Sequence, residues 1–125
     1  MGGNLSILYG LQGSVSDIDT ENKILFIEDL DEYFYHIDRM ITSLKRAKKL
    51  DKLAGLIVGS MKDMHDNNIS YGATANEIIY NAVKEFNYPV CFNFPSGHLN
   101  DNRCLVLGLE TKLSIQKNGV ILEQK

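Results

Sequence analysis

The stretch Ile24-Leu25-Phe26-Ile27-Glu28-Asp29 decides how the rest of the chain is arranged. Its four consecutive apolar residues are typical of a buried strand and are too few to cross a membrane. The run ends in two carboxylates, Glu28 and Asp29. A buried strand that ends in an acid can place a catalytic group at the rim of an α/β core. The alternative is that both acids are solvated loop residues before a helix, whose N-terminal end favours negative charge.

Length and composition indicate a single domain over residues 1–125. The chain is 44% hydrophobic, which is enough apolar material for a core without disulfides or metals. Its net charge is −3 with mixed signs, which argues against a nucleic-acid partner. No apolar run is long enough to span a membrane, so a membrane partner is not expected. Cys91 and Cys104 stand in apolar segments and are expected to be reduced core residues.

Apolar periodicity predicts the remaining elements. In chain order we expect a strand at Leu5–Leu11, the central strand at residues 24–29, a helix over residues 33–49, a strand at Leu56–Val58, a polar loop over Ser60–Gly72, a helix opened by Thr74-Ala75-Asn76-Glu77, a strand at Val90–Phe92, and further strands at Leu105–Leu107, Leu113–Ile115 and Val120–Leu122. Thr-x-x-Glu is a capping box, in which side chains satisfy the first amides of a helix. Asn118-Gly119 predicts a hairpin turn between the last two strands.

The order of these elements predicts an α/β fold. The middle of the chain reads as strand, helix, strand, helix, strand, which implies a small parallel sheet with right-handed crossovers. The flanking strands are expected to form a second, partly antiparallel layer.

The three histidines show no metal-ligand spacing. His36 lies in the first predicted helix, His65 lies in the polar loop, and His98 follows Gly97 in the loop after a predicted strand. No His-Glu-x-x-His motif and no cluster of Cys and His is present. We therefore expect neither a metal nor a cofactor.

Glu28 and His98 are the best candidates for catalysis. Both follow buried strands of the predicted parallel sheet, so both should emerge at the same edge. A neutral histidine suits general-base work near pH 7, and a carboxylate can orient it. The alternative is that His98 is an ordinary surface residue. A nucleophile is missing. No Gly-x-Ser-x-Gly elbow exists, and none of the serines near a glycine is followed by a clear helix N-terminus (Ser14, Ser16, Ser60, Ser96).

Four segments in this order resemble one known family. They are Gly2-Gly3-Asn4-Leu5-Ser6, Ile24–Asp29, Tyr35-His36-Ile37-Asp38-Arg39-Met40 and Pro95-Ser96-Gly97-His98. Together they resemble the C-terminal domain of the LD-carboxypeptidases, serine peptidases that include the microcin-immunity peptidases. The resemblance implies a two-domain enzyme with a swivelling β/β/α C-terminal domain and a Ser-His-Glu triad. It implies that Glu28 and His98 are catalytic, and that the nucleophilic serine belongs to an N-terminal domain outside this chain.

The resemblance also implies an activity. The full-length parent would release terminal D-alanine from murein tetrapeptide during cytoplasmic cell-wall recycling, and this chain alone would be inactive. Its partners would be the murein peptide and the missing N-terminal domain, and a homodimer stays open. Two alternatives remain, an amidase acting on peptidyl-nucleotide antibiotics and a non-catalytic binding or dimerisation module.

Three positions depart from the family pattern. Asp31 stands where a glycine is common, His36 where an arginine is usual, and Val106 where a proline is usual. None of the three belongs to the implied triad, but they leave substrate specificity open.

Overall fold

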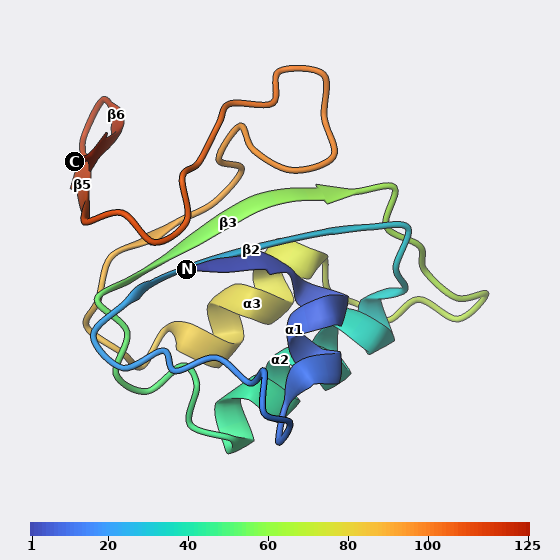
Figure 1. Ribbon diagram of the computed structural model, residues 1–125. Helices are drawn as coiled ribbons and strands as arrows, with labels where there is room; N and C mark the ends of the chain where they lie inside the picture. Colours follow the sequence, from blue (N-terminus) through green and yellow to red (C-terminus); the bar gives the residue numbers. More distant parts are fainter.

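The computed structural model describes residues 1–125 and is organised around one central strand pair, β2 and β3 (Figure 1). The elements are, in chain order, β1 (Gly2–Asn4), α1 (Leu5–Leu11), β2 (Ile24–Leu30), α2 (Phe34–Arg46), β3 (Gly55–Lys62), α3 (Ala75–Val83), β4 (Val90–Cys91), β5 (Thr111–Gln116) and β6 (Gly119–Gln124). Strands β1 to β4 form one sheet in that order, and all three pairings are parallel. The predicted α/β class and the small parallel sheet are confirmed.

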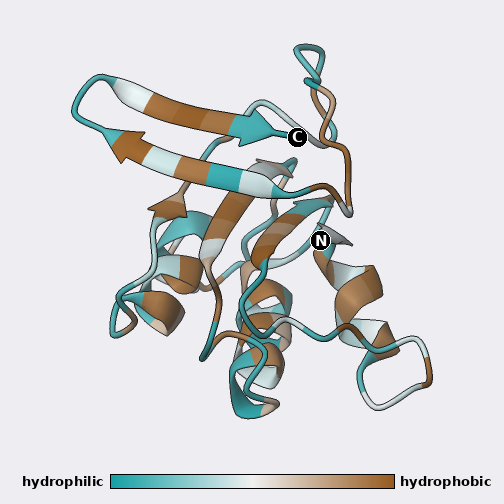
Figure 2. Ribbon diagram, turned by 60° about the vertical axis from the view of Figure 1, so that its left-hand side comes forward, coloured by the Kyte–Doolittle hydropathy of each residue, from teal (hydrophilic) through white to brown (hydrophobic).

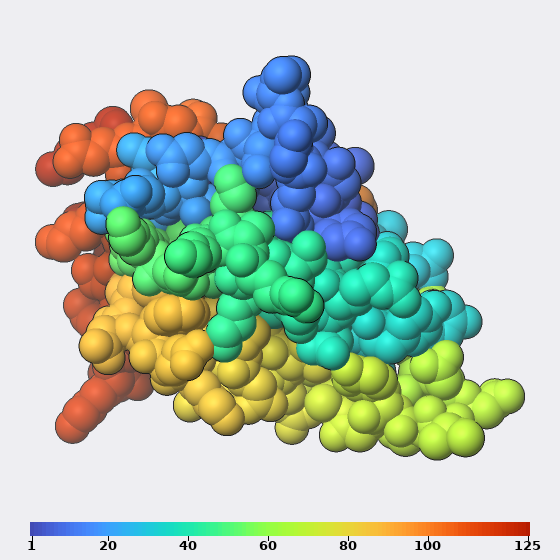
Figure 3. Space-filling model, turned by 90° about the horizontal axis from the view of Figure 1, so that it is seen from below, coloured from blue at the N-terminus to red at the C-terminus, as the bar shows by residue number.

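The three helices lie on one face of this sheet (Figure 1). Seen from the helix side, α1, α2 and α3 lie next to one another, and the C-terminal segment projects beyond them at one edge (Figure 3). The opposite face of the sheet is covered by the segment after β4 and by the β5–β6 hairpin (Figures 1 and 2). Pairing of β5 with β6 is antiparallel and separate from the main sheet, as expected for the flanking strands.

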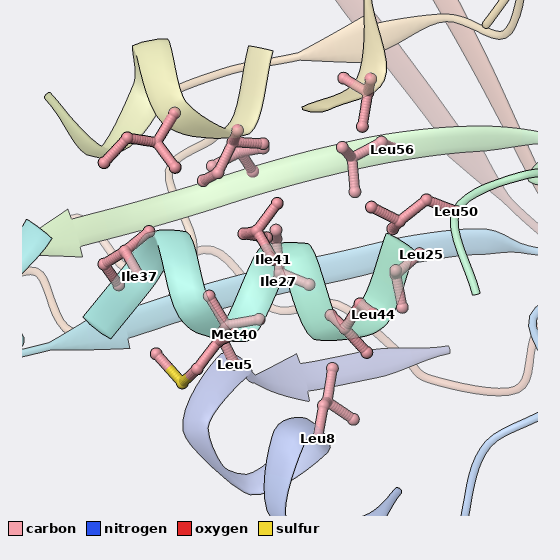
Figure 4. Close-up of a cluster of buried hydrophobic side chains, with 14 of the residues drawn as sticks. Leu5, Leu8, Leu25, Ile27, Ile37, Met40, Ile41, Leu44, Leu50 and Leu56 are labelled. Carbon is pink, nitrogen blue, oxygen red and sulfur yellow. The ribbon is translucent and has the colours of Figure 1, made fainter. Parts of the chain in front are cut away.

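Alternate residues of β2 face the two sides of the sheet. Leu25 and Ile27 belong to the main core with the helices, whereas Phe26 packs with Ile57 and Cys91 on the other side. Helix α2 contributes one apolar face to the main core, as its spacing predicts (Ile37, Met40, Ile41, Leu44; Figure 4). Both faces of β2 are therefore covered, which is why its sequence is a continuous apolar run rather than an alternating one.

Two helices begin close to where the sequence predicts. Helix α3 starts after Thr74, whose side chain accepts from the backbone of Glu77 while the Glu77 carboxylate accepts from the backbone of Thr74. The predicted capping box is thus confirmed. The hydrogen bonds that the Glu77 carboxylate accepts from the backbone and the hydroxyl of Thr74 lower the pKa of Glu77, because they stabilise its ionised form. The helix predicted over residues 33–49 is confirmed with its bounds shortened to Phe34–Arg46.

The strand predicted at Leu5–Leu11 is wrong, because these residues form helix α1. Asn4 caps the helix by accepting a hydrogen bond from the backbone of Ile7 at 3.1 Å. Leu5 and Leu8 then point into the core with helical spacing. The strand lies just before, at β1, where Gly2 packs so closely on β2 that a β-carbon would stand 1.9 Å from the Phe26 carbonyl oxygen. A glycine-rich edge strand has no apolar residues to mark it, so the apolar pattern of the sequence places the strand in the following segment, Leu5–Leu11, instead.

The strand predicted at Leu105–Leu107 is also wrong, because this segment has no regular secondary structure. The backbone N–H of Val106 donates to Oε1 of Gln124, and Nε2 of Gln124 donates to the Val106 carbonyl, both at 3.0 Å. A side-chain amide therefore takes the place of a neighbouring strand. The hairpin predicted after it is confirmed, with Gln116 paired to Gly119 across the turn residues Lys117 and Asn118.

Candidate active site

Glu28 lies near the end of β2 with its side chain buried. Only 8% of that side chain is exposed, so it is not a solvated loop acid. The pairing of β2 with β3 shifts at this point, from Ile27 opposite Val58 to Asp29 opposite Met61. Glu28 therefore stands opposite two residues, Gly59 and Ser60. Such a bulge re-aims side chains and is frequent beside active sites.

The structure brings Glu28 and His98 together across 70 residues of sequence. Nδ1 of His98 lies 2.6 Å from Oε2 of Glu28, which is hydrogen-bonding distance. The imidazole is half exposed, and Nε2 has no hydrogen-bond partner within the chain. A carboxylate on Nδ1 selects the tautomer whose Nε2 is free to accept a proton. The pair is thus arranged as a base with its orienting acid, and its catalytic role stays a prediction.

Gly97 is required where the His98 loop meets β2. Its φ angle is +117°, a conformation that side-chain-bearing residues rarely adopt. A β-carbon there would lie 2.4 Å from Oγ of Ser60 and 2.9 Å from Oε2 of Glu28. The loop can therefore bring His98 to Glu28 only because residue 97 has no side chain.

Asp29 follows Glu28 in sequence but has a structural role. Its carboxylate accepts hydrogen bonds from the Asn4 amide at 2.9 Å, from the backbone and hydroxyl of Ser6 at 3.0 and 2.9 Å, and from the backbone of Leu30 at 2.9 Å. It is 2% exposed and lies on the helix side of the sheet, at the start of α1. Asp29 therefore joins β2 to the first helix and is not part of the His98 pair.

The other two histidines also pair with carboxylates, but elsewhere. Nδ1 of His36 lies 2.5 Å from Oε2 of Glu32, four residues earlier and just before α2 begins. Nε2 of His65 lies 2.5 Å from Oδ1 of Asp31. Neither ring hydrogen-bonds to Glu28 or His98, and no group of three or more His, Cys, Asp or Glu side chains is placed to hold a metal ion. The sequence alone did not indicate either of these pairs.

No serine hydroxyl hydrogen-bonds to the imidazole of His98. From the sequence, Ser60 is considered only as a nucleophile, whereas in the structure its hydroxyl accepts a hydrogen bond from the His98 backbone at 2.8 Å. Asn102, which the sequence does not single out, accepts from the Gly97 backbone at 3.0 Å. One signal for Ser60 was present in the sequence, since it follows the predicted strand Leu56–Val58 closely and so belongs to the same sheet edge as Glu28. In the structure it lies within β3, which extends to Lys62.

A cavity of about 460 Å³ opens beside Glu28. It is lined by both polar and apolar residues of the sheet and of the segment after β4 (Phe26, Glu28, Ser96, Gly97, Asn102, Arg103, Cys104, Leu105, Leu107). A second cavity of about 450 Å³ shares Phe26, Leu105 and Leu107 with it and is more apolar. The carboxylate of the pair therefore borders a space that a small ligand can enter.

The two cysteines differ in exposure. Cys91 is buried, and burial raises the pKa of its thiol because a thiolate is poorly stabilised there. Cys104 is exposed and borders the cavity beside Glu28, so the expectation that both are core residues is wrong for Cys104. The sequence next to Cys104 predicts an apolar strand, but in the structure this segment lies at the surface.

Alkylation should separate the two thiols. We expect iodoacetamide to modify Cys104 in the native chain at least roughly tenfold faster than Cys91, because only an accessible thiolate reacts. Mass spectrometry of a time course, with and without guanidinium chloride, measures both rates. In Cys104→Ser the native chain should take up label only at the slow rate of Cys91. Equal rates at the two positions in the native chain would contradict the burial of Cys91.

No helix of this chain combines the length and the apolar character needed to cross a membrane.

Comparison with known proteins identifies the protein family. Residues 1–113 match the sequence model of the family described as LD-carboxypeptidase C-terminal domain. The chain belongs to this family of carboxypeptidase-like peptidases. Among curated relatives, a probable murein peptide carboxypeptidase of Bacillus subtilis is 29% identical over 123 residues, which are 98% of this chain and 39% of that protein. A putative carboxypeptidase of Synechocystis sp. is 31% identical over 111 residues, 89% of this chain and 37% of that protein.

Solved structures share the fold. The crystal structure of muramoyltetrapeptide carboxypeptidase from Oxalobacter formigenes superposes with a TM-score of 0.87 at 27% identity, over 98% of this chain and 42% of that one. The microcin C7 self-immunity protein MccF, in complex with glutamyl sulfamoyl guanosine, has a TM-score of 0.84 at 28% identity, over all of this chain and 37% of that one. The chain thus spans about two-fifths of the length of the relatives it matches.

Proposed function

We propose that Glu28 and His98 are two members of a Ser-His-Glu triad, and that residues 1–125 form the C-terminal domain of a two-domain serine peptidase. The contact of 2.6 Å between Nδ1 of His98 and Oε2 of Glu28 carries this proposal. The free Nε2 is the atom that a serine from elsewhere would approach. The relatives are more than twice as long as this chain, which leaves room for an N-terminal domain that supplies the nucleophile.

The proposed mechanism assigns one role to each residue. The serine of the other domain attacks the carbonyl carbon of an L,D peptide bond, and Nε2 of His98 takes its proton. His98 then gives that proton to the leaving amine. The buried Glu28 carboxylate accepts a hydrogen bond from Nδ1–H, holds the ring in this tautomer and stabilises the imidazolium that forms. Water hydrolyses the acyl-enzyme by the same proton transfers in the second half of the reaction.

The proposed substrate is murein tetrapeptide, and the product is its terminal D-alanine, released in cytoplasmic cell-wall recycling. Two similar proteins support this choice, the probable murein peptide carboxypeptidase of B. subtilis and the muramoyltetrapeptide carboxypeptidase of O. formigenes. An amidase acting on peptidyl-nucleotides is the second candidate. It is favoured by the similarity to MccF, whose structure holds an aminoacyl sulfamoyl nucleoside. A non-catalytic module requires Glu28 and His98 to be unrelated loop residues, and their contact argues against it.

The test is D-alanine release from murein tetrapeptide by the purified full-length parent. We expect release by the parent, no release by residues 1–125 alone, and loss of activity in His98→Ala. His65→Ala is the matched control, since His65 also pairs with a carboxylate but not with Glu28. Release by the short chain that His98→Ala abolishes would show that the nucleophile lies within residues 1–125. A folded parent that leaves the tetrapeptide intact but cleaves a glutamyl sulfamoyl nucleoside would establish the amidase instead.

A further inference from the structure

We infer that Ser60 and Asn102 are positioning residues that hold the backbone of the His98 loop, so that the imidazole stays aligned with Glu28. This inference rests on the proposed function of the Glu28–His98 pair. Two consecutive backbone N–H groups, those of Gly97 and His98, carry it. Each donates to a side chain instead of to another backbone group, Gly97 to Oδ1 of Asn102 at 3.0 Å and His98 to Oγ of Ser60 at 2.8 Å.

Ser60 joins the loop to the sheet twice. Its backbone N–H donates to the Ser96 carbonyl at 3.0 Å, while its hydroxyl accepts from His98. Ser60 lies on β3 in the bulge opposite Glu28, which lies on β2. Neighbouring strands therefore hold the two parts of one histidine. β2 holds the ring through Glu28, and β3 holds the backbone through Ser60.

Asn102 closes the loop on itself. Its side-chain oxygen binds the N–H of Gly97, five residues earlier, and the backbone of the next residue, Arg103, donates to the Pro95 carbonyl at 2.7 Å. The segment from Pro95 to Arg103 is thus a compact loop whose ends meet. The loop itself contains no helix or strand, since it lies between β4 and the hairpin. These side-chain hydrogen bonds take over the role that strand pairing would have.

Alignment at this point controls the rate of proton transfer. The α-carbon of Gly97 faces both the Ser60 hydroxyl and the Glu28 carboxylate, so a shift of the loop moves His98 relative to its acid. A displacement of about 1 Å in a catalytic group can lower turnover by a factor of about 100. Loss of either hydrogen bond should therefore reduce kcat. KM should change little, because the Ser60 hydroxyl and the Asn102 side-chain oxygen both bind the backbone of the His98 loop, although Asn102 also lines the cavity beside Glu28.

The experiment measures kcat and KM for D-alanine release from murein tetrapeptide by the full-length parent. We expect Ser60→Ala and Asn102→Ala each to lower kcat about tenfold with KM unchanged within about twofold, and the double variant to lower it further. Ser60→Thr and Asn102→Asp keep the accepting oxygen and should restore most of the rate. Asn100→Ala is the matched control, because Asn100 is an exposed residue of the same loop whose side chain makes no hydrogen bond. Circular dichroism confirms that each variant is folded.

The outcomes separate this inference from the proposed function. An inactive folded wild-type parent contradicts the proposed function. The inference alone is overturned if the wild type is active and Glu28→Gln is inactive, while Ser60→Ala and Asn102→Ala both keep full kcat. A raised KM with unchanged kcat also overturns it, since it would make these residues substrate contacts. If Ser60→Ala does not fold, the inference is tested by kcat and KM of Asn102→Ala and Asn102→Asp, judged in the same way.

Discussion

Replacing Glu28 with glutamine in the full-length parent is expected to lower kcat for D-alanine release by about four orders of magnitude. Loss of the orienting carboxylate has about this effect in serine proteases, where the amide leaves the geometry intact but selects the wrong tautomer. Glu28 is buried and its Oε2 lies 2.6 Å from Nδ1 of His98, so the substitution acts directly on the hydrogen bond that orients the ring. Steady-state kinetics with murein tetrapeptide measures the effect.

Asp29→Asn is the matched control for Glu28→Gln. The two acids are adjacent and both are buried, but Asp29 binds Asn4 and Ser6 on the helix side of the sheet. We expect Asp29→Asn to lower the melting temperature while the folded enzyme keeps most of its kcat. If the two substitutions reduce kcat equally, Glu28 does not have the specific role proposed here.

Replacing Gly97 with alanine is expected to lower kcat by a factor of about 100 or more. The substitution places a β-carbon 2.4 Å from Oγ of Ser60 and 2.9 Å from Oε2 of Glu28, at a φ of +117°. Both atoms belong to groups that hold His98, so the loop must move away from β2. A shift of about 1 Å in such a group is enough for a loss of this size.

Gly108→Ala is the control for Gly97→Ala. Gly108 also has a positive φ, +98°, but no atom lies within 4 Å of its missing β-carbon. Both variants therefore introduce backbone strain, of roughly 1–3 kcal/mol, and only Gly97→Ala also collides with the Glu28 pair. The comparison uses kcat together with the melting temperature. A similar kcat in the two variants would mean that strain, and not the collision at His98, accounts for the loss.

Elements with a strong local pattern could be predicted from the sequence. The apolar run of β2, the spacing of α2, the capping box of α3 and the hairpin predicted from Asn118-Gly119 are all confirmed, the turn lying one residue earlier, at Lys117–Asn118. In each, the residues that define the element lie within a few positions of one another. The hydrogen bonds and turn geometry that form it are therefore local as well.

Elements that depend on distant partners could not be predicted in this way. β1 is a strand because Gly2 can lie against the backbone of Phe26, not because of its own side chains. Leu105–Leu107 has the composition of a strand, but Gln124 occupies the backbone groups of Val106. Cys104 lies in the same apolar segment and is nevertheless exposed.

The sequence by itself determined that a buried strand delivers two adjacent acids, and that His98 follows a glycine at the same sheet edge. Only the tertiary structure decided which acid meets the histidine. Residues 28 and 29 point to opposite faces, so Asp29 binds the start of α1 while Glu28 faces the His98 loop. That loop reaches Glu28 across 70 residues and is held by Ser60 and Asn102. Local periodicity carries no information about such contacts, because they depend on how the strands align in space.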